Sequence, residues 1–367
     1  MPTIPFFMAA GIITGPHTPG LVLIRDPADL EVFAAVGLIM LLLHLGLEFS
    51  LADLTKGGPR LLATGGLYIL LNVGGGLALG LTLSWGTQEA FVIAGAVGIS
   101  SSAIVTKLLV ELKRLANRET PMILGVIVVE DVFLALYLAL LQPILGRAQE
   151  PLEAVLLFGR AFAFLTALFL VARFGARWAG RLVSSDDDEL LTVVFVGLAI
   201  LVAGLAEEIG VSDAIGAFMV GLILAETKAA PRIERLVLPL RDAFASVFFF
   251  AFGLTIDPAD VAMVVWPVAL AAALSIALNV TAGIFAARIN GLERLEAANA
   301  GLTLLGRGEF SLIIATLAAA AGLDTRIGPF VALYVFVLAV ASPLLASRSN
   351  DLARFLPRRL FSKERTV

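Results

Sequence analysis

The segment Val128-Val129-Glu130-Asp131-Val132-Phe133 places two adjacent carboxylates within an apolar run from Pro121 to Leu141. No Lys or Arg lies between Arg118 and Arg147, so no nearby residue in the sequence neutralises them. An apolar run of about 20 residues is typical of a membrane-spanning helix. Carboxylates inside a span are costly and usually face a cavity or a partner. The segment therefore predicts a functional carboxylate pair, with a structural pair held by other helices as the alternative.

The composition of the whole chain agrees with a membrane protein. The 367 residues are 59% hydrophobic and 15% charged, and the mean hydropathy is +0.97. A soluble domain carries about 25% charged residues, and a membrane β-barrel would show short alternating segments instead of long apolar runs. The absence of cysteine excludes disulfides and thiol chemistry, and two histidines, His17 and His44, argue against a multi-histidine metal site. The predicted class is an all-α, polytopic membrane protein.

Charged loops separate the apolar runs into about 12 predicted transmembrane segments. Alternating crossings place nearly all loop Lys and Arg residues on one side and leave Arg25, Arg147 and Arg326 on the other. Because cytoplasmic loops carry the excess of Lys and Arg, both ends of the chain are predicted to be cytoplasmic. Residues 1–350 form the transmembrane domain, and 351–367 form a basic cytoplasmic tail. The segments are 5–15, 30–49, 61–85, 91–112, 121–145, 152–182, 190–209, 214–225, 237–256, 261–287, 295–321 and 327–346.

Two blocks of three segments, 61–145 and 261–346, share one plan. The middle segment is interrupted by Ser100-Ser101-Ser102 in the first block and by Gly306-Arg307-Gly308-Glu309 in the second. Alternation of the crossings makes the blocks inverted relative to each other. Inverted repeats with discontinuous helices that meet at mid-membrane are the pattern of secondary transporters. The alternative for the serines is a continuous helix in which their hydroxyls bond back to the main chain.

The carboxylate pair can support exchange of a cation for a proton. Glu130 and Asp131 point about 100° apart on a helix, so one can face the crossing while the other faces a neighbouring domain. Partial dehydration favours the protonated form of a carboxylic acid. Oxygen ligands from Asp131, serine hydroxyls and freed carbonyls suit Na⁺ or K⁺. Competition of the cation and the proton for one carboxylate is enough to produce antiport.

Short stretches spread over almost the whole chain match the motifs of a known family. They are 10–16, 46–49, 100–105, 130–131, 216–221, 248–253 and 308–310. In this order and spacing the chain resembles the Kef-type monovalent cation/proton antiporters and their sodium-exchanging relatives, which share the sodium/hydrogen exchanger fold. The resemblance implies an elevator transporter with two crossed discontinuous helices. It also implies a core domain, about 61–145 and 258–346, and a dimerisation domain from the rest.

The resemblance also implies roles for individual residues. Asp131 matches the family's invariant ion-binding aspartate, which would hold the monovalent cation, and Glu130 matches the variable residue before it. Ser101 and Ser102 are expected to contribute to ion binding at the first crossing. Gly308 and Glu309, together with Ser100, Asn279 and Arg307, are expected to form the crossing and to compensate its charges.

The expected setting and ion follow from the same resemblance. The protein is expected to be a homodimer in the lipid bilayer of the cell inner membrane, to serve pH homeostasis, and to need no cofactor and no nucleic-acid partner. K⁺ is the favoured cation and Na⁺ (or Li⁺) the alternative. A separate cytoplasmic regulatory subunit is left open, because the nucleotide-binding domain often fused to relatives is absent.

The chain departs from the family pattern in ways that leave specific questions open. Asn279 stands where many relatives have Lys or Arg, so Arg307 is the basic residue nearest the crossing, with Glu130, Asp131, Glu309 or water as its partner. Glu130 is then protonated, tied to Arg307, or a second proton site. One-for-one exchange is favoured over a higher proton stoichiometry. The family's first helix of 13 is expected to be missing. An ion channel and an intramembrane protease are the rival classes.

Overall fold

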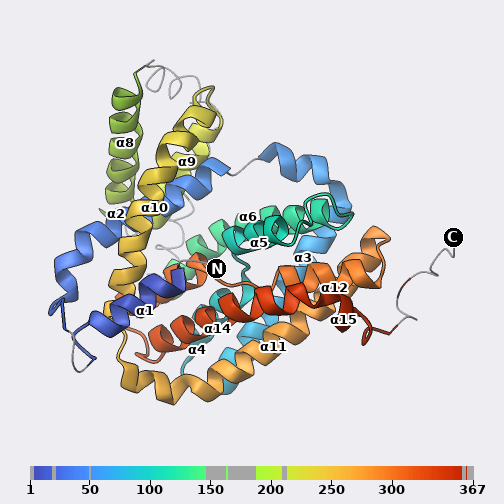
Figure 1. The fold of residues 1–367 in the computed structure, drawn as a ribbon. Helices are drawn as coiled ribbons and strands as arrows, with labels where there is room; N and C mark the ends of the chain where they lie inside the picture. Colours follow the sequence, from blue (N-terminus) through green and yellow to red (C-terminus); the bar gives the residue numbers. More distant parts are fainter. Residues whose placement is uncertain are drawn as a thin grey trace. The chain divides into compact units, whose positions relative to one another are not determined.

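The computed structural model describes residues 4–18, 22–48, 51–145, 163, 187–208, 213–357 and 361. Every regular element within these ranges is a helix, which confirms the all-α prediction (Figure 1). A short 3₁₀ helix, Pro27–Leu30, precedes α2. The α-helices are α1 (Ile4–Thr14), α2 (Glu31–Glu48), α3 (Leu51–Leu83), α4 (Thr87–Gly98), α5 (Ser102–Glu111), α6 (Thr120–Leu145), α8 (Asp188–Glu208), α9 (Asp213–Ala225), α10 (Ala230–Leu254), α11 (Pro258–Asn290), α12 (Arg294–Thr303), α13 (Glu309–Ala320), α14 (Ile327–Ser347) and α15 (Ser349–Ala353).

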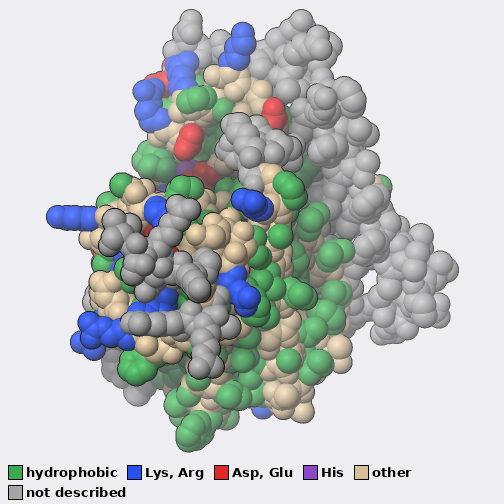
Figure 2. Space-filling view, turned by 90° about the vertical axis from the view of Figure 1, so that its right-hand side faces the viewer, with side chains coloured by type: hydrophobic (Ala, Val, Ile, Leu, Met, Phe, Trp, Pro, Cys, Tyr) green, Lys and Arg blue, Asp and Glu red, His purple; other side chains and the backbone are tan. Residues whose placement is uncertain are grey.

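The described helices have the length and composition of membrane spans. Eight candidate spans are found, and two shorter apolar helices, Ile215–Ala225 and Glu309–Ala320, accompany them. Figure 2 shows broad hydrophobic surface together with Lys and Arg side chains that gather on part of one face. Apart from residue 163, the predicted segment 152–182 lies outside the described residues. The multi-pass membrane class is confirmed.

The chain divides into two compact units. Unit 1 contains Met1–Phe6, Leu51–Leu134 and Ile256–Val367, and unit 2 contains Phe7–Ser50 and Ala135–Thr255. Both interrupted segments belong to unit 1. In unit 2, α2 packs closely on α9, since a Cβ at Gly46 would lie 2.1 Å from the carbonyl oxygen of Phe218. The assignment of the two units to a core and a dimerisation domain stays a prediction.

Unit 1 contains the second predicted three-segment block and the first block as far as Leu134, whereas the end of α6 from Ala135 belongs to unit 2. The first runs through α3, α4, α5 and α6, and the second through α11, α12, α13 and α14. Helix α3 starts at Leu51, earlier than the expected start near residue 61, and bends at Gly58, where φ is +64°. Pro59 follows directly and cannot donate a main-chain hydrogen bond, which explains the bend. The short helix α15 was not predicted.

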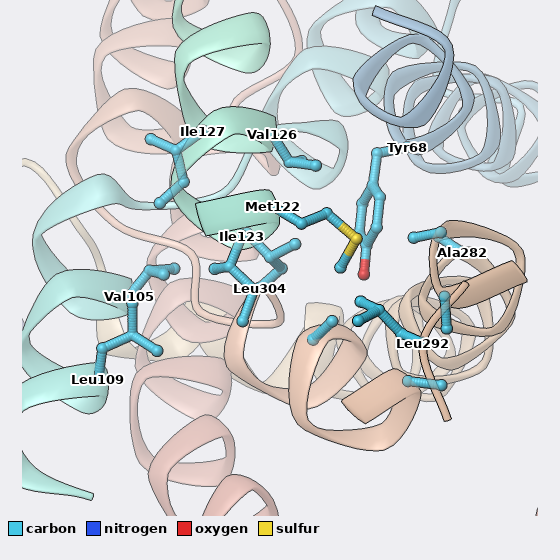
Figure 3. Close-up of a cluster of buried hydrophobic side chains, with 14 residues drawn as sticks. Tyr68, Val105, Leu109, Met122, Ile123, Val126, Ile127, Ala282, Leu292 and Leu304 are labelled. Carbon is cyan, nitrogen blue, oxygen red and sulfur yellow. The ribbon is translucent and has the colours of Figure 1, made fainter. Parts of the chain in front are cut away.

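A buried apolar cluster lies between α5, α6, α3 and the α11–α12 pair, and one face of α5 packs against it (Figure 3). It takes Tyr68 from α3 and Leu304 from the end of α12, so both blocks contribute. Burial of apolar side chains stabilises by about 25 cal/mol per Å² of surface removed from contact with solvent. A short helix with many such contacts is held in place despite its length. The remaining members are Val105, Leu109, Met122, Ile123, Val126, Ile127, Ala282, Ala286, Ala287, Leu292, Ala297 and Ala300.

The loop between α13 and α14 is fastened to the end of α3. The Arg326 guanidinium lies 4.7 Å from the centroid of the Trp85 ring, and its Nε donates to Asp324 Oδ1 at 2.9 Å. Trp85 also contacts the Phe330 ring edge-on at 5.6 Å. A cation–π contact at an exposed site contributes about 0.5–1 kcal/mol. This loop therefore joins the first block to the second at one end of unit 1.

We expect Asp324→Asn to reduce the acid sensitivity of the fold. Hydrogen bonds from Arg326 lower the pKa of Asp324 below its usual range. A lowered folded-state pKa stabilises the fold above about pH 4, and that stabilisation is lost as the pH falls further. The effect is at most about 1 kcal/mol, because Arg326 is 39% exposed and solvent screens the pair.

Thermal unfolding of detergent-solubilised protein at pH 7 and pH 3.5 measures this difference. Wild type should lose more stability on acidification than Asp324→Asn. The exposed Asp351→Asn variant, whose carboxylate is 3.8 Å from Arg354, should behave as wild type and serves as the control. Equal acid sensitivity of wild type and Asp324→Asn would contradict the prediction.

Candidate functional site

The first interrupted segment is a broken helix. Helix α4 ends at Gly98, Ile99 is extended with φ −112° and ψ 130°, and α5 begins at Ser102. Ser101 is the N-cap of α5, and its hydroxyl accepts a hydrogen bond from the Ile104 N–H at 3.4 Å. Serine at this position is favoured because it satisfies a free N–H group at a helix start. The break is confirmed, and the alternative of a continuous helix is wrong.

The second interrupted segment is broken in the same way and crosses the first. Helix α12 ends at Thr303 and α13 begins at Glu309, with Gly308 as its N-cap. The Ser101 N–H donates to the carbonyl oxygen of Gly306 at 2.9 Å, which links the two breaks through the main chain. A Cβ at Gly308 would lie 2.6 Å from Ser101 Oγ. Glycine is therefore required there by the close approach of the two segments.

Arg307 compensates the C-terminal ends of both half-helices that lead into the crossing. Its side chain is completely buried. Its Nε donates to the carbonyl oxygen of Val97 in α4 at 2.8 Å, and its Nη1 donates to that of Leu304, just past α12, at 2.9 Å. Carbonyls at a helix C-terminus lack partners and carry partial negative charge. One guanidinium therefore neutralises two helix ends, which identifies main-chain oxygens as partners of Arg307.

Glu309 lies at the opposite ends, where the two outgoing half-helices begin. It is the first residue of α13 and is 7% exposed. Its Oε2 accepts a hydrogen bond from the hydroxyl of Ser101, the N-cap of α5, at 2.9 Å. A carboxylate is favourable near helix N-termini because free N–H groups give them partial positive charge. Arg307 and Glu309 thus supply charges of opposite sign to the two kinds of helix end.

The carboxylate pair on α6 divides between two environments. Glu130 is 1% exposed, and Ser100 Oγ lies 3.2 Å from its Oε1. Ser100 Oγ also lies 2.8 Å from the carbonyl oxygen of Leu304 and receives Arg307 Nη1 at 3.4 Å. Glu130 Oε2 is buried and has no hydrogen-bond partner among the described residues. The side chain of Asp131 is half-buried, so Glu130 is the more deeply enclosed member.

Asn279 joins the crossing through a residue that the sequence reasoning missed. Both Asn279 and Asn72 are fully buried. Asn72 Oδ1 accepts from Asn279 Nδ2 at 2.9 Å and from Arg307 Nη2 at 3.2 Å. The signal in the sequence was a lone amide in the apolar segment 61–85, the same kind of signal that singled out Glu130. Ser102, the first residue of α5, is half-buried.

Two broken helices that meet at their breaks, with charges at the helix ends, are the arrangement found in secondary transporters. The comparison with known families gives a more specific result. Residues 1–347 match the transmembrane sodium/hydrogen exchanger family, and the chain belongs to that family. The resemblance to Kef-type cation/proton antiporters is confirmed, and the protein is a cation/proton antiporter.

Relatives and a solved structure extend over most of the chain. The K⁺/H⁺ antiporter subunit KhtU of Bacillus subtilis is 41% identical over 96% of this chain and 89% of its own length. The ammonium/H⁺ antiporter subunit AmhT of Alkalihalophilus pseudofirmus is 30% identical over 87% and 81%, respectively. The sodium proton antiporter MjNhaP1 of Methanocaldococcus jannaschii superposes with a TM-score of 0.66 at 17% identity, covering 95% of this chain and 93% of its own. That likeness shows the shared fold.

We expect Gly308→Ala to disrupt the crossing. The new methyl group would collide with Ser101 Oγ, so the two breaks must separate or the serine must lose its bond to Glu309. Overpacking of this kind costs about 1–3 kcal/mol. Both the temperature of thermal unfolding and the rate of cation-dependent proton release from proteoliposomes should fall. Gly74→Ala in α3 meets open space and should leave both near wild type. Wild-type transport by Gly308→Ala would contradict the close approach.

We expect Arg307→Met to destabilise unit 1 strongly. Methionine fills part of the volume but leaves the carbonyls of Val97 and Leu304 without the donors that the guanidinium supplies. Loss of these bonds should cost about 3 kcal/mol or more. Chemical or thermal unfolding in detergent measures the loss. The exposed Arg354→Met variant should change stability by at most about 0.5 kcal/mol. Equal stability of the two variants would refute the assigned role.

Proposed function

We propose that the protein exchanges K⁺ for protons, with Asp131 as the shared carrier and the core domain moving as an elevator. The observation that carries the proposal is the placement of the pair on α6. Glu130 is buried in the crossing, whereas the adjacent Asp131 keeps partial exposure. A carrier that binds ions from both sides must be able to reach water. A buried neighbour that bonds to the crossing can hold α6 in place while Asp131 exchanges its ligand.

The choice of K⁺ is supported by the relatives, with Na⁺ as the alternative. KhtU, at 41% identity, is a K⁺/H⁺ antiporter subunit. GerN of Bacillus cereus, at 27% identity, is a Na⁺/H⁺-K⁺ antiporter. Carboxylate, hydroxyl and carbonyl oxygens serve both ions, and selectivity depends on the size and field of the site. Ser101 and Ser102 are the hydroxyls that we assign to the cation beside Asp131.

The proposed exchange is one cation for one proton. If the cation and the proton compete for Asp131, each leg of the cycle carries one of them. Glu130 contributes no second proton in this scheme. Its carboxyl group stays hydrogen-bonded to Ser100, which in turn accepts a hydrogen bond from Arg307. Arg307 and Glu309 are assigned to the helix ends, and Asp131 is assigned to transport.

The proposed setting is a homodimer in the cell inner membrane with both ends of the chain in the cytoplasm. Unit 2 would supply the dimer contacts while unit 1 would carry the ion. KhtU and AmhT are each named as antiporter subunits, which supports a separate regulatory subunit for this chain as well. Such a partner would act at the cytoplasmic side, where most Lys and Arg residues are predicted.

We expect Asp131→Asn to abolish exchange and Glu130→Gln to retain it with a shifted pH profile. The asparagine keeps the size of the side chain but cannot carry a proton or balance a cation. Collapse of a pH gradient in everted vesicles, with K⁺, Na⁺ and Li⁺ compared side by side, measures the rate and the ion preference. Full exchange by Asp131→Asn would show that the carrier assignment is wrong. Cation flux without proton movement would indicate a channel.

A further inference from the structure

The chemistry of Arg307 fixes the orientation of two buried amides. A guanidinium has hydrogen-bond donors and no acceptor. The atom of Asn72 that lies 3.2 Å from Arg307 Nη2 must therefore be its oxygen. The Asn72 amide nitrogen, on the other side, donates to the carbonyl oxygen of Tyr68 at 3.0 Å, which agrees with this orientation. The assignment of oxygen and nitrogen thus follows from the neighbour.

The same argument extends from Asn72 to Asn279. The atom of Asn279 that lies 2.9 Å from the oxygen of Asn72 must be its amide nitrogen. That nitrogen also donates to the carbonyl oxygen of Ser275 at 2.9 Å, so both of its hydrogens are used. The oxygen of Asn279 therefore points away from Asn72. It is buried and has no hydrogen-bond partner among the described residues.

A buried oxygen without a donor is unfavourable and calls for a ligand or a functional explanation. Among the described residues, three buried side-chain oxygens lack a partner: Asn279 Oδ1 on α11, Glu130 Oε2 on α6 and Thr303 Oγ1 on α12. Thr303 is the last residue of α12, directly before the second break. Oxygen atoms of amides, hydroxyls and carboxylates are the ligands that hard cations prefer.

We propose that Asn72 is a positioning residue that presents Asn279 Oδ1 as an oxygen ligand for the transported monovalent cation. The inference rests on the proposed function, because it concerns the same ion. Arg307 fixes which way the Asn72 amide is oriented, and Asn72 in turn fixes the orientation of the Asn279 amide. The oxygen of Asn279 then points away from Asn72. If Asn72 is lost, the Asn279 amide is free to rotate and its oxygen is no longer held in one direction.

The test measures the KM for K⁺ and for Na⁺ in proteoliposomes, apart from the maximal rate. Asn72→Leu removes the acceptor, and Asn279→Leu removes the oxygen itself. Each should raise the cation KM by about three- to tenfold, the value of one hydrogen bond or ligand contact. The double variant should be no worse than Asn279→Leu alone, because Asn72 acts through Asn279.

Asn290 provides a matched control. Its Nδ2 donates to Thr64 Oγ1 at 3.0 Å, so it also joins α11 to α3, but it is the last residue of α11, about three helical turns beyond Asn279. Asn290→Leu should leave the cation KM unchanged even if it lowers stability. If Asn72 had only a structural role, Asn72→Leu would leave the cation KM unchanged, as Asn290→Leu does.

A binding measurement separates this inference from the proposed function. K⁺ should raise the melting temperature of wild type in detergent, since a ligand that binds the folded state stabilises it. Asn279→Leu should require more K⁺ for the same rise, and this holds even if Asn72→Leu does not fold. Wild-type KM in both leucine variants, or additive effects in the double variant, would overturn the inference. Failure of wild type to exchange K⁺ or Na⁺ for protons would instead overturn the proposed function.

Discussion

The free main-chain groups at two broken helices are the constraint on which unit 1 depends. Within a bilayer, a carbonyl or N–H group without a partner costs several kcal/mol. Residues of the second break supply partners for both segments. Arg307 donates hydrogen bonds to a carbonyl of α4 and to one at the end of α12, and the Glu309 carboxylate accepts a hydrogen bond from Ser101, the N-cap of α5. The positions of the other polar residues follow from this arrangement: Ser100 lies between Arg307, Leu304 and Glu130, and both amides are oriented by the guanidinium.

Features marked by local sequence were predicted well. The long apolar runs predicted apolar helices, of which eight in the described part of the chain are long enough to span a membrane, and polar or glycine residues inside two runs predicted the breaks at Ser100–Ser102 and at Gly306–Glu309. The adjacency of Glu130 and Asp131 predicted that they face different surroundings, but periodicity alone does not say which one faces the crossing. That choice depends on the packing of α6 against the breaks.

Contacts that join distant parts of the chain were not predicted. The partners of Arg307 include main-chain carbonyls, which every residue has and no motif marks. Asn72 is marked in the sequence, because a lone amide in an apolar span needs a buried partner just as a carboxylate does. The short helix α15 follows the last span, and Ser349, its first residue, bonds to Asn299 of α12 at 2.6 Å. A segment this short carries no periodic pattern.

The separation between Val97 and its donor has a consequence for how the protein is made. The carbonyl of Val97 receives its hydrogen bond from a side chain 210 positions later in the chain. During synthesis, the first block leaves the ribosome and enters the membrane long before Arg307 exists. Until the second block is inserted, other donors must therefore bond to the carbonyls at the break of the first block. Water, lipid headgroups and the insertion machinery can supply such donors. Biogenesis of the first block is thus completed by the last quarter of the chain.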